Sequence, residues 1–363
     1  MIKRVIIIYG TSAELLKLYP LIRKLKTKYK IQLVNSNQQI EDTSILEKYL
    51  EIEPDVKIEN TESLAHKSKI QSIIWIIKNF YKIYLVLKIN SSKVSNEYSL
   101  VLIHGDTITA TLAAIICKIL KLRCAHIEAG LRSNKLLHPF PEEINRIIIS
   151  KCSKIHFCQD DRAIANIGIN KNTLVNTYGN TIYDMLKIEI EKNKIIDQSK
   201  DSQKFGLVSL HRVELLNSNR ALRDVFQTLI EISKRIKLVL VVDNLTKRKL
   251  IDFKILEPML NSNIEIKEKM IYPDFIQKVL NCEFIITDSG GLQEEAAVLG
   301  IPCLIYRKAT ERNDGLGVNA VLSDWDNSIT LKFVEEYKQY RKSYVETNVS
   351  PTDIIFEYIN KFN

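Results

Sequence analysis

Several features by which common protein classes are recognised are missing from this sequence. None of its six cysteines forms a close C-x-x-C pair, so neither a zinc finger nor a dithiol redox site is expected. Buried free thiols in a reducing compartment explain these cysteines better. No dense Lys/Arg block with interleaved aromatic residues occurs, so the net charge of +9 predicts a solvated surface rather than a nucleic-acid interface. A positive field of this kind would also favour an anionic substrate.

Long uninterrupted apolar runs are missing as well. The apolar run at 5–9 is too short for the core of a signal peptide and predicts a first strand. The stretch at 70–89 is interrupted by Lys78, Lys82 and Lys88, and its apolar residues recur at helical spacing. A membrane span needs about 20 apolar residues without such charges. We therefore expect a cytoplasmic protein without a membrane partner, in which this amphipathic helix covers a subunit interface or an interdomain contact.

Two phosphate-binding signatures and any metal-ligand cluster are also absent. No segment has the pattern G-x-x-x-x-G-K-[ST], which excludes a P-loop kinase or ATPase. No strand leads into G-x-G-x-x-G, so tightly bound NAD is not expected. His, Asp and Glu residues do not occur at metal-ligand spacing, so we expect no obligatory metal.

What the chain does contain is a regular alternation of strand and helix patterns. Strands are expected at 5–9, 31–34, 99–104, 123–127, 154–158, 205–210, 238–242, 284–287 and 302–306, with helices between them. Such alternation predicts an α/β protein with parallel sheets covered by helices on both faces. A chain of 363 residues is longer than a single hydrophobic core usually accommodates. We expect Rossmann-like domains at 1–175 and 176–345, and a C-terminal helix at 346–363 that has the option of returning to the first domain.

Unusual polar residues follow the predicted strands. Asp106, Glu128, His211 and Ser289 all lie where a strand ends. In open parallel sheets, ligands bind outside the carboxyl ends of the strands. This placement is the strongest physical indication of an enzyme.

The segment 288–295 is a glycine-rich loop that leads into a helix. The backbone N–H groups of Ser289, Gly290 and Gly291, together with the helix dipole, suit a pyrophosphate. Two glutamates in the first helical turn would repel phosphate, so one of them is better placed to accept hydrogen bonds from ribose. A tight turn with acidic helix capping explains the loop equally well.

Three carboxylates are candidates for acid–base chemistry. Taken singly, Asp106 is explained as a helix N-cap, and Glu142 as half of an ion pair with Arg146 at i, i+4. As a set with Glu128 they predict the unequal pKa values that proton transfer requires. His211 followed by Arg212 at a strand end suits a leaving-group diphosphate.

Six motifs in series resemble the non-hydrolysing UDP-N-acetylglucosamine 2-epimerases, in order and spacing, over nearly the whole chain. They are Ile103-His104-Gly105-Asp106-Thr107, His126-Ile127-Glu128-Ala129-Gly130-Leu131-Arg132, Pro141-Glu142-Glu143-Ile144-Asn145-Arg146, Gly179-Asn180-Thr181 with His211-Arg212, Thr287 to Glu295, and Thr310-Glu311-Arg312.

The resemblance implies two Rossmann-like domains of the GT-B type facing a central cleft, usually as a homodimer. It implies anti elimination of UDP to a 2-acetamidoglucal, followed by re-addition of UDP and protonation of C2 from the other face, without NAD. The resemblance also implies a role for each matching residue: Asp106, Glu128 and Glu142 as acid–base groups, His211 on the departing diphosphate, and Lys17, Arg146, Arg212, Phe275, Ser289, Gly290, Gly291, Glu295 and Arg312 in substrate binding.

Departures from the family pattern leave other outcomes open. The first loop has Ser12 where the family usually has Arg, and Gln39 stands at the usual His of a G-Q-H segment associated with activation by substrate. The alternatives are a hydrolysing relative that releases UDP and free N-acetylmannosamine, a GT-B glycosyltransferase, and an inactive nucleotide-sugar sensor. Retention of all three carboxylates argues against a transferase and a sensor.

Overall fold

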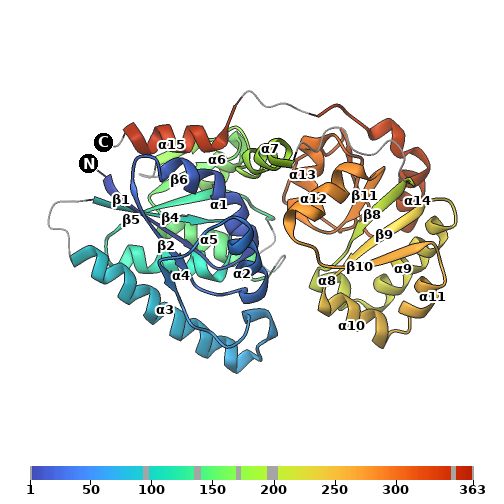
Figure 1. Ribbon diagram of the computed structural model, residues 1–363, viewed down its shortest axis with the longest axis horizontal. Helices are drawn as coiled ribbons and strands as arrows, with labels where there is room; N and C mark the ends of the chain where they lie inside the picture. The colour runs from blue at the N-terminus through green and yellow to red at the C-terminus, as the bar shows by residue number, and fades with distance from the viewer. Residues whose placement is uncertain are drawn as a thin grey trace. The chain divides into compact units, whose positions relative to one another are not determined.

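The computed structural model describes residues 2–92, 98–134, 140–168, 173–193, 203–344 and 349–361, and the chain divides into two compact units (Figure 1). One unit comprises Met1–Ile188 with Asn348–Asn363, and the other comprises Glu189–Thr347. The first unit therefore extends past the boundary at 175 expected from the sequence. The physical reason is that Asn180 and Asp184 bond to first-unit residues, Asn180 to Glu128 and Asp184 to the backbone of Thr352.

The first unit is built on a seven-stranded parallel sheet in the order β3-β2-β1-β4-β5-β6-β7. Its strands are β1 (Ile2–Tyr9), β2 (Lys30–Asn35), β3 (Val56–Lys57), β4 (Tyr98–His104), β5 (Arg123–Ala129), β6 (Ile155–Cys158) and β7 (Thr173–Asn176). The central strands are buried on both faces, which is why β1 and β4 are nearly continuous apolar runs.

Helices cover both faces of this sheet. They are α1 (Ser12–Leu25), α2 (Ile40–Tyr49), α3 (Lys69–Ser92), α4 (Ile108–Ile119), α5 (Glu142–Cys152), α6 (Asp161–Ile167), α7 (Ile182–Asn193) and α15 (Pro351–Lys361). The neighbours α3, α4 and α5 pack side by side on one face, whereas α15 packs against α1 (Figure 1). Thr11 and Glu14 form a capping box at the start of α1.

Helix α3 buries an apolar face, as predicted, but part of its solvent-exposed face is apolar as well. Trp75, Ile83 and Leu87 are buried against the sheet and α4. The side chains that remain exposed include Ile70, Ile73, Ile74, Ile77, Tyr81 and Ile89. By length and composition alone, the window Ile70–Ile89 would be sufficient to cross a membrane. Its packing against the sheet instead indicates a surface helix of the first unit with an uncovered apolar stripe.

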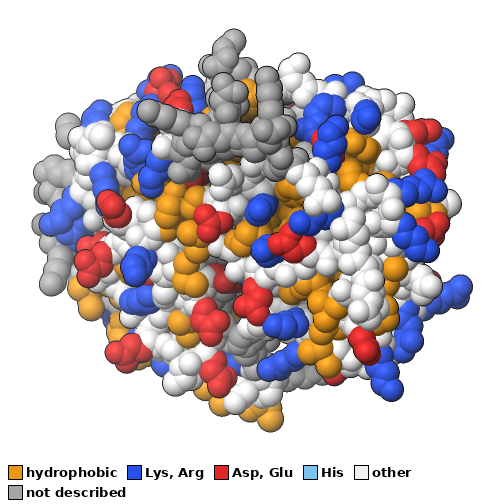
Figure 2. All heavy atoms as spheres, turned by 45° about the vertical axis from the view of Figure 1, so that its right-hand side comes forward, with side chains coloured by type: hydrophobic (Ala, Val, Ile, Leu, Met, Phe, Trp, Pro, Cys, Tyr) orange, Lys and Arg blue, Asp and Glu red, His pale blue; other side chains and the backbone are white. Residues whose placement is uncertain are grey.

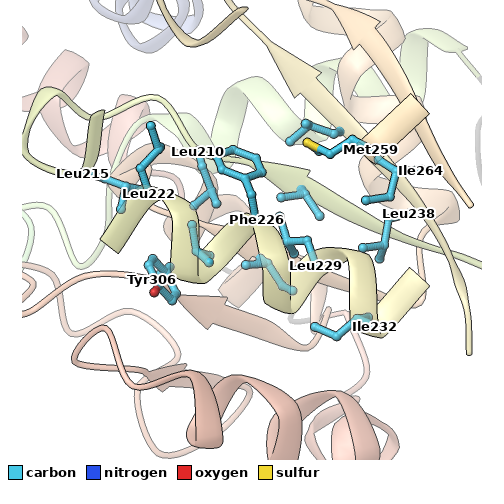
Figure 3. Packing of buried hydrophobic residues seen from close by; sticks show 14 of the residues in the cluster. Leu210, Leu215, Leu222, Phe226, Leu229, Ile232, Leu238, Met259, Ile264 and Tyr306 are labelled. Carbon is cyan, nitrogen blue, oxygen red and sulfur yellow. The ribbon is translucent and has the colours of Figure 1, made fainter. Parts of the chain in front are cut away.

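The second unit contains a six-stranded parallel sheet in the order β10-β9-β8-β11-β12-β13. Its strands are β8 (Phe205–Ser209), β9 (Lys237–Val242), β10 (Ile264–Glu268), β11 (Phe284–Thr287), β12 (Cys303–Ile305) and β13 (Ala320–Leu322). Its helices are α8 (Val213–Leu216), α9 (Asn219–Ser233), α10 (Asn244–Asp252), α11 (Leu256–Leu260), α12 (Tyr272–Asn281), α13 (Gly290–Leu299) and α14 (Asn327–Glu336). Leu222, Phe226 and Leu229 of α9 fill the core over β8 and β9 (Figure 3).

The mixture of charges on the surface and the free, mostly buried cysteines agree with what the sequence predicts. On the face drawn in Figure 2, Lys and Arg side chains are interspersed with Asp and Glu rather than gathered in one block. All six cysteines are free thiols, and all except Cys152 are buried. Burial raises the pKa of the Cys282 thiol to about 12, so this side chain is an uncharged core residue.

Candidate active site

Two of the predicted carboxylates lie at the carboxyl ends of neighbouring strands of the first sheet. Strand β4 ends at His104 and is followed by Gly105, whose φ of 66° turns the chain toward Asp106. The adjacent β5 has a register shift at Glu128, which is an extra residue relative to β6 and has a φ of 62°. A bulge with left-handed backbone re-aims a side chain at the cost of local strain, which is found mostly at functional positions. The sequence correctly placed both residues at the same sheet edge.

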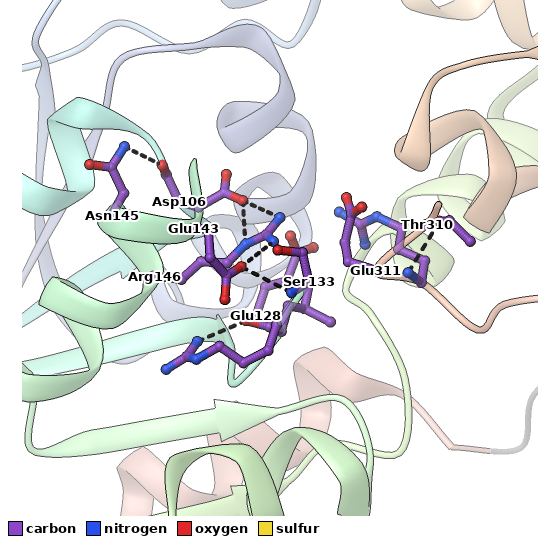
Figure 4. Close-up of polar contacts among 12 residues, drawn as sticks. Asp106, Glu128, Ser133, Glu143, Asn145, Arg146, Thr310 and Glu311 are labelled. Carbon is purple, nitrogen blue, oxygen red and sulfur yellow. Dashed lines mark hydrogen bonds and ion pairs between the residues drawn. The ribbon is translucent and has the colours of Figure 1, made fainter. Parts of the chain in front are cut away.

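Arg146 holds Asp106 in place (Figure 4). Its Nε and Nη2 atoms lie 2.8 and 2.7 Å from Oδ2 of Asp106, and its Nη1 donates to Glu143 at 3.1 Å. Glu143 also accepts a hydrogen bond from the backbone N–H of Ser133. Besides the i, i+4 pair with Glu142 considered from the sequence, Arg146 thus has an i, i+3 ion pair with Glu143. Glu142 is the first residue of α5.

Glu128 lies in a buried polar cluster. Its Oε2 forms an ion pair with Lys17 of α1 and accepts a hydrogen bond from Nδ2 of Asn180. The Nε2 atom of His104, at the end of β4, is 3.9 Å from the same oxygen. Side chains of Lys17 and Glu128 are only 9% and 6% exposed, so this carboxylate is held by charge and hydrogen bonds in a poorly solvated position.

The N-terminus of α1 is closed by the protein's own oxygens. Glu14 accepts hydrogen bonds from Gly10 N–H and from the hydroxyl of Thr107, and burial raises its pKa to about 7. Oε1 of Gln39 accepts from the backbone and the hydroxyl of Ser12 at the start of α1. The positions at which this sequence departs from the family pattern, Ser12 and Gln39, thus bind each other.

In the second unit, Asp288 organises the predicted diphosphate residues. This buried carboxylate follows β11 and accepts hydrogen bonds from the backbone N–H groups of His211 and Arg212, at 2.8 to 3.1 Å. The imidazole Nδ1 of His211 lies 3.7 Å from Asp288, and the imidazole is 42% exposed. The loop after β8 is therefore fixed through its backbone while the imidazole faces solvent.

Helix α13 begins at the glycine-rich loop. Ser289 is its N-cap, and its hydroxyl accepts from the backbone N–H of Leu292. A Cβ at Gly290 would lie 2.6 Å from Nε of Arg312, whose guanidinium forms a buried ion pair with Glu294. At Gly291 the nearest atom to an added Cβ is 3.9 Å away, so the protein leaves space beside this backbone.

Of the two glutamates in this helix, Glu294 is committed to Arg312 and Glu295 to a tyrosine. Oε1 of Glu295 accepts from the hydroxyl of Tyr272 at 3.0 Å. Tyr272 and the half-buried Phe275 both lie on α12. Phe275 therefore lies on the helix that contacts Glu295.

Comparison with known proteins places this geometry in a family. Residues 23–349 match the model of the family described as UDP-N-acetylglucosamine 2-epimerase. The chain belongs to the UDP-N-acetylglucosamine 2-epimerase family. The enzyme of that name from Methanococcus maripaludis is 33% identical over 348 residues, which cover 91% of this chain and 90% of the relative.

Solved epimerase structures share the fold over the full chain. The UDP-GlcNAc 2-epimerase from Neisseria meningitidis bound to UDP-GlcNAc has a TM-score of 0.84 at 26% identity, covering 99% of this chain and 100% of that one. The Methanocaldococcus jannaschii epimerase in complex with UDP-GlcNAc and UDP has a TM-score of 0.82 at 25% identity, with the same coverage. The predicted family, the α/β fold of GT-B type and the assignment as an epimerase enzyme are confirmed.

Sequence reasoning missed three residues that contact the predicted site residues within the two units of this epimerase. Asp288 and Glu294 were read only as part of a loop, and Asn180 only as part of a motif. The available signal was residue type: Asn at the start of a helix and Asp after a strand are positions where side chains commonly bind backbone N–H groups. Among the described residues, no group of three or more His, Cys, Asp or Glu is placed to hold a metal ion.

Proposed function

We propose that this epimerase interconverts UDP-N-acetylglucosamine and UDP-N-acetylmannosamine by elimination and re-addition of UDP. In the first step a base removes the C2 proton, the C2 electrons form the C1–C2 double bond, and the C1–O bond breaks with its electrons passing to UDP. The intermediate is a 2-acetamidoglucal. UDP then returns to C1 while a proton is delivered to C2 from the opposite face. No hydride leaves the sugar, so the proposed reaction does not use NAD, and we propose it without an obligatory metal.

The observation that carries the proposal is the setting of Glu128. A carboxylate on a strained bulge, buried against Lys17 and placed at the same sheet edge as Asp106, suits proton transfer at a carbon acid better than a structural role. Asp106, Glu128 and Glu142 are assigned as the acid–base groups. Arg146 orients Asp106 through its paired contact, and Lys17 does the same for Glu128.

The residues of the second unit are assigned to the nucleotide. Ser289, Gly290 and Gly291 at the start of α13 offer backbone N–H groups and the positive end of a helix dipole to the diphosphate. His211, Arg212 and Arg312 supply further donors and positive charge, and His211 stabilises the departing diphosphate. Glu295 is assigned to the ribose hydroxyls, and Phe275 to stacking on uracil.

We further propose that the epimerase works as a cytoplasmic homodimer. Its six free thiols suit a reducing compartment. The exposed apolar stripe of α3, defined by Ile70, Ile73, Ile74, Ile77, Tyr81 and Ile89, is the surface we assign to the second copy. An apolar stripe at this helical spacing fits the self-complementary packing of a two-fold dimer.

Product analysis tests the reaction. Purified protein is incubated with UDP-N-acetylglucosamine in ordinary buffer, and the anomeric proton signals are followed by NMR, with Glu128→Gln as the inactive control. Growth of the UDP-N-acetylmannosamine signal to a constant ratio is the expected result. Release of UDP and free N-acetylmannosamine would instead identify a hydrolysing enzyme. An unchanged substrate with retained UDP binding would contradict epimerisation and favour a transferase or a sensor.

A further inference from the structure

Asn180 donates a hydrogen bond to Glu128, and its surroundings leave its amide group one orientation. Its Oδ1 accepts from the backbone N–H of Ile182 at 3.1 Å, at the first residue of α7, and its backbone carbonyl accepts from the N–H of Tyr183 at 3.0 Å. An amide whose oxygen is held by a helix N-terminus must present its NH₂ group on the other side. That NH₂ group contacts Oε2 of Glu128.

The contact is built into the fold rather than made by chance at the surface. Asn180 is 4% exposed, and it lies 52 residues from Glu128 along the chain. The turn before it is defined by Gly179, whose φ of 151° carries the chain from β7 into α7. Helix α7 is tied in turn to α15, because Asp184 accepts from the backbone N–H of Thr352. The position of Asn180 is therefore fixed by two helices.

We propose that Asn180 is a positioning residue for Glu128, using its amide to hold the carboxylate in its proton-transfer orientation on the β5 bulge. This inference rests on the proposed function, in which Glu128 transfers a proton at C2. The charged or titratable groups near Glu128 include Lys17 from α1, His104 from β4 and His126 from β5 itself. The neutral Asn180 amide restricts the orientation of the Glu128 carboxylate and leaves the net charge of the cluster unchanged.

Two substitutions of Asn180 separate its role as a hydrogen-bond donor to Glu128 from its role as a cap of helix α7. Asn180→Ser keeps an oxygen that can cap α7 but removes the NH₂ group. Asn180→Asp also keeps the cap but places a second carboxylate against Glu128. Because like charges at this separation disfavour double ionisation, the carboxylate pair in Asn180→Asp must lose its last proton at a higher pH than Glu128 does in Asn180→Ser.

A matched control lies in the same segment. Asn176, at the end of β7, donates through Nδ2 to the exposed carboxylate of Asp161 at 2.7 Å. Asn176→Ser therefore removes an Asn–carboxylate hydrogen bond of the same kind without touching Glu128. It should leave kcat, KM and their pH dependence unchanged.

The experiment measures kcat and KM for UDP-N-acetylglucosamine between pH 5.5 and 9, together with Tm, for the wild type and the three variants. Asn180→Ser should lose roughly 10- to 100-fold in kcat, the effect of misplacing a reacting group, with KM and Tm nearly unchanged. Asn180→Asp should shift the acidic limb of the kcat profile to higher pH. Wild-type kcat in Asn180→Ser, or identical profiles for the Ser and Asp variants, would overturn the proposal.

A second readout is independent of turnover. The Glu128 carboxyl carbon, labelled with ¹³C and assigned by its loss in Glu128→Gln, is titrated by NMR without substrate. A higher titration midpoint in Asn180→Asp than in Asn180→Ser supports the contact, and equal midpoints overturn it. If the wild type shows no epimerase activity while this difference in midpoints is seen, the proposed function fails and the hydrogen-bonding role of Asn180 survives.

Discussion

At the scale of single residues, the two glycines of the α13 loop differ in what surrounds them. The space beside Gly290 is filled by the protein itself, because Arg312 lies against the position of a Cβ. The space beside Gly291 is open, with only the Ser289 hydroxyl within 4 Å. A glycine that the protein does not need for its own packing points to close approach of a ligand to the backbone.

Gly291→Ala should therefore separate binding from folding. Alanine is a better helix former than glycine by about 1 kcal/mol, so Tm should be unchanged or slightly higher. The added methyl would stand where we place the diphosphate, so the Kd for UDP, measured by calorimetry, should rise at least about tenfold, which corresponds to about 1.4 kcal/mol.

The comparison variant is Gly290→Ala, in which the new Cβ meets Arg312 and a lower Tm is expected. Unchanged UDP affinity in Gly291→Ala would remove this loop from the nucleotide site.

Some of the candidate site residues could be predicted from the sequence alone. Asp106, Glu128, His211 and Ser289 were found because a polar residue directly after an apolar strand is a local pattern. The contact of Asn180 with Glu128 was not found, because these two residues are 52 positions apart in the sequence. Nothing local in the sequence distinguishes Glu143 from Glu142 as a partner of Arg146.

At the scale of secondary-structure elements, three neighbouring strands carry buried histidines. His126 of β5 is paired in register with His156 of β6, and their rings meet edge to face at 6.3 Å. Burial lowers the pKa of His126 to about 3 and that of His156 to about 4. The backbone carbonyl of Gly105 is 2.7 Å from Nε2 of His126, which links this pair to the turn that presents Asp106.

This pair predicts an acid-sensitive fold. Unfolded histidine has a pKa of about 6.5, so below that pH the unfolded chain binds protons that the folded chain excludes. The part of the unfolding free energy that depends on these histidines is fully present above pH 6.5. It is lost as the pH decreases toward their pKa values in the folded protein. Each histidine should cost about 2 kcal/mol of unfolding free energy between pH 6.5 and pH 5.

Urea unfolding at pH 7.5 and pH 5 measures the loss. His156→Leu should show a smaller decrease than the wild type, by about 2 kcal/mol. An equal decrease in both proteins would show that His156 does not titrate on unfolding as described.

The strands that the sequence predicted are those whose residues are mostly buried. The β1, β4, β8 and β11 strands were predicted because strands buried on both faces are continuous apolar runs. The short edge strands β3, β7, β10 and β13 were missed, since two to five residues with partly exposed positions give no such run. Missing β7 and α7 is also the reason that the domain boundary was placed too early.

At the scale of the whole molecule, the exposed stripe of α3 is the feature that a monomer does not explain. Its side chains include Ile73, Ile74 and Ile77, each more than half exposed, on a helix whose opposite side is fully packed. No Asp or Glu occurs within α3. Burial of this stripe against a second copy would remove apolar surface from water at about 25 cal/mol per Å².

Ile77→Lys should therefore convert a dimer to a monomer, because it places a charge in the middle of an apolar interface. Sedimentation velocity measures the change. Ile251→Lys, which alters an equally exposed isoleucine on α10 of the second unit, is the matched control and should leave the mass unchanged. A monomeric wild type, or a dimeric Ile77→Lys protein, would contradict the assignment of this surface.

The central claim is that this epimerase makes and breaks the C2–H bond of its substrate. The most direct measurement is proton NMR of the protein with UDP-N-acetylglucosamine in D₂O. The account predicts that the C2 proton signal disappears from the product as the anomeric signal of UDP-N-acetylmannosamine grows, because the new C2 proton comes from solvent. Epimerised product that keeps its original C2 proton, or substrate that binds without any exchange at C2, would contradict it.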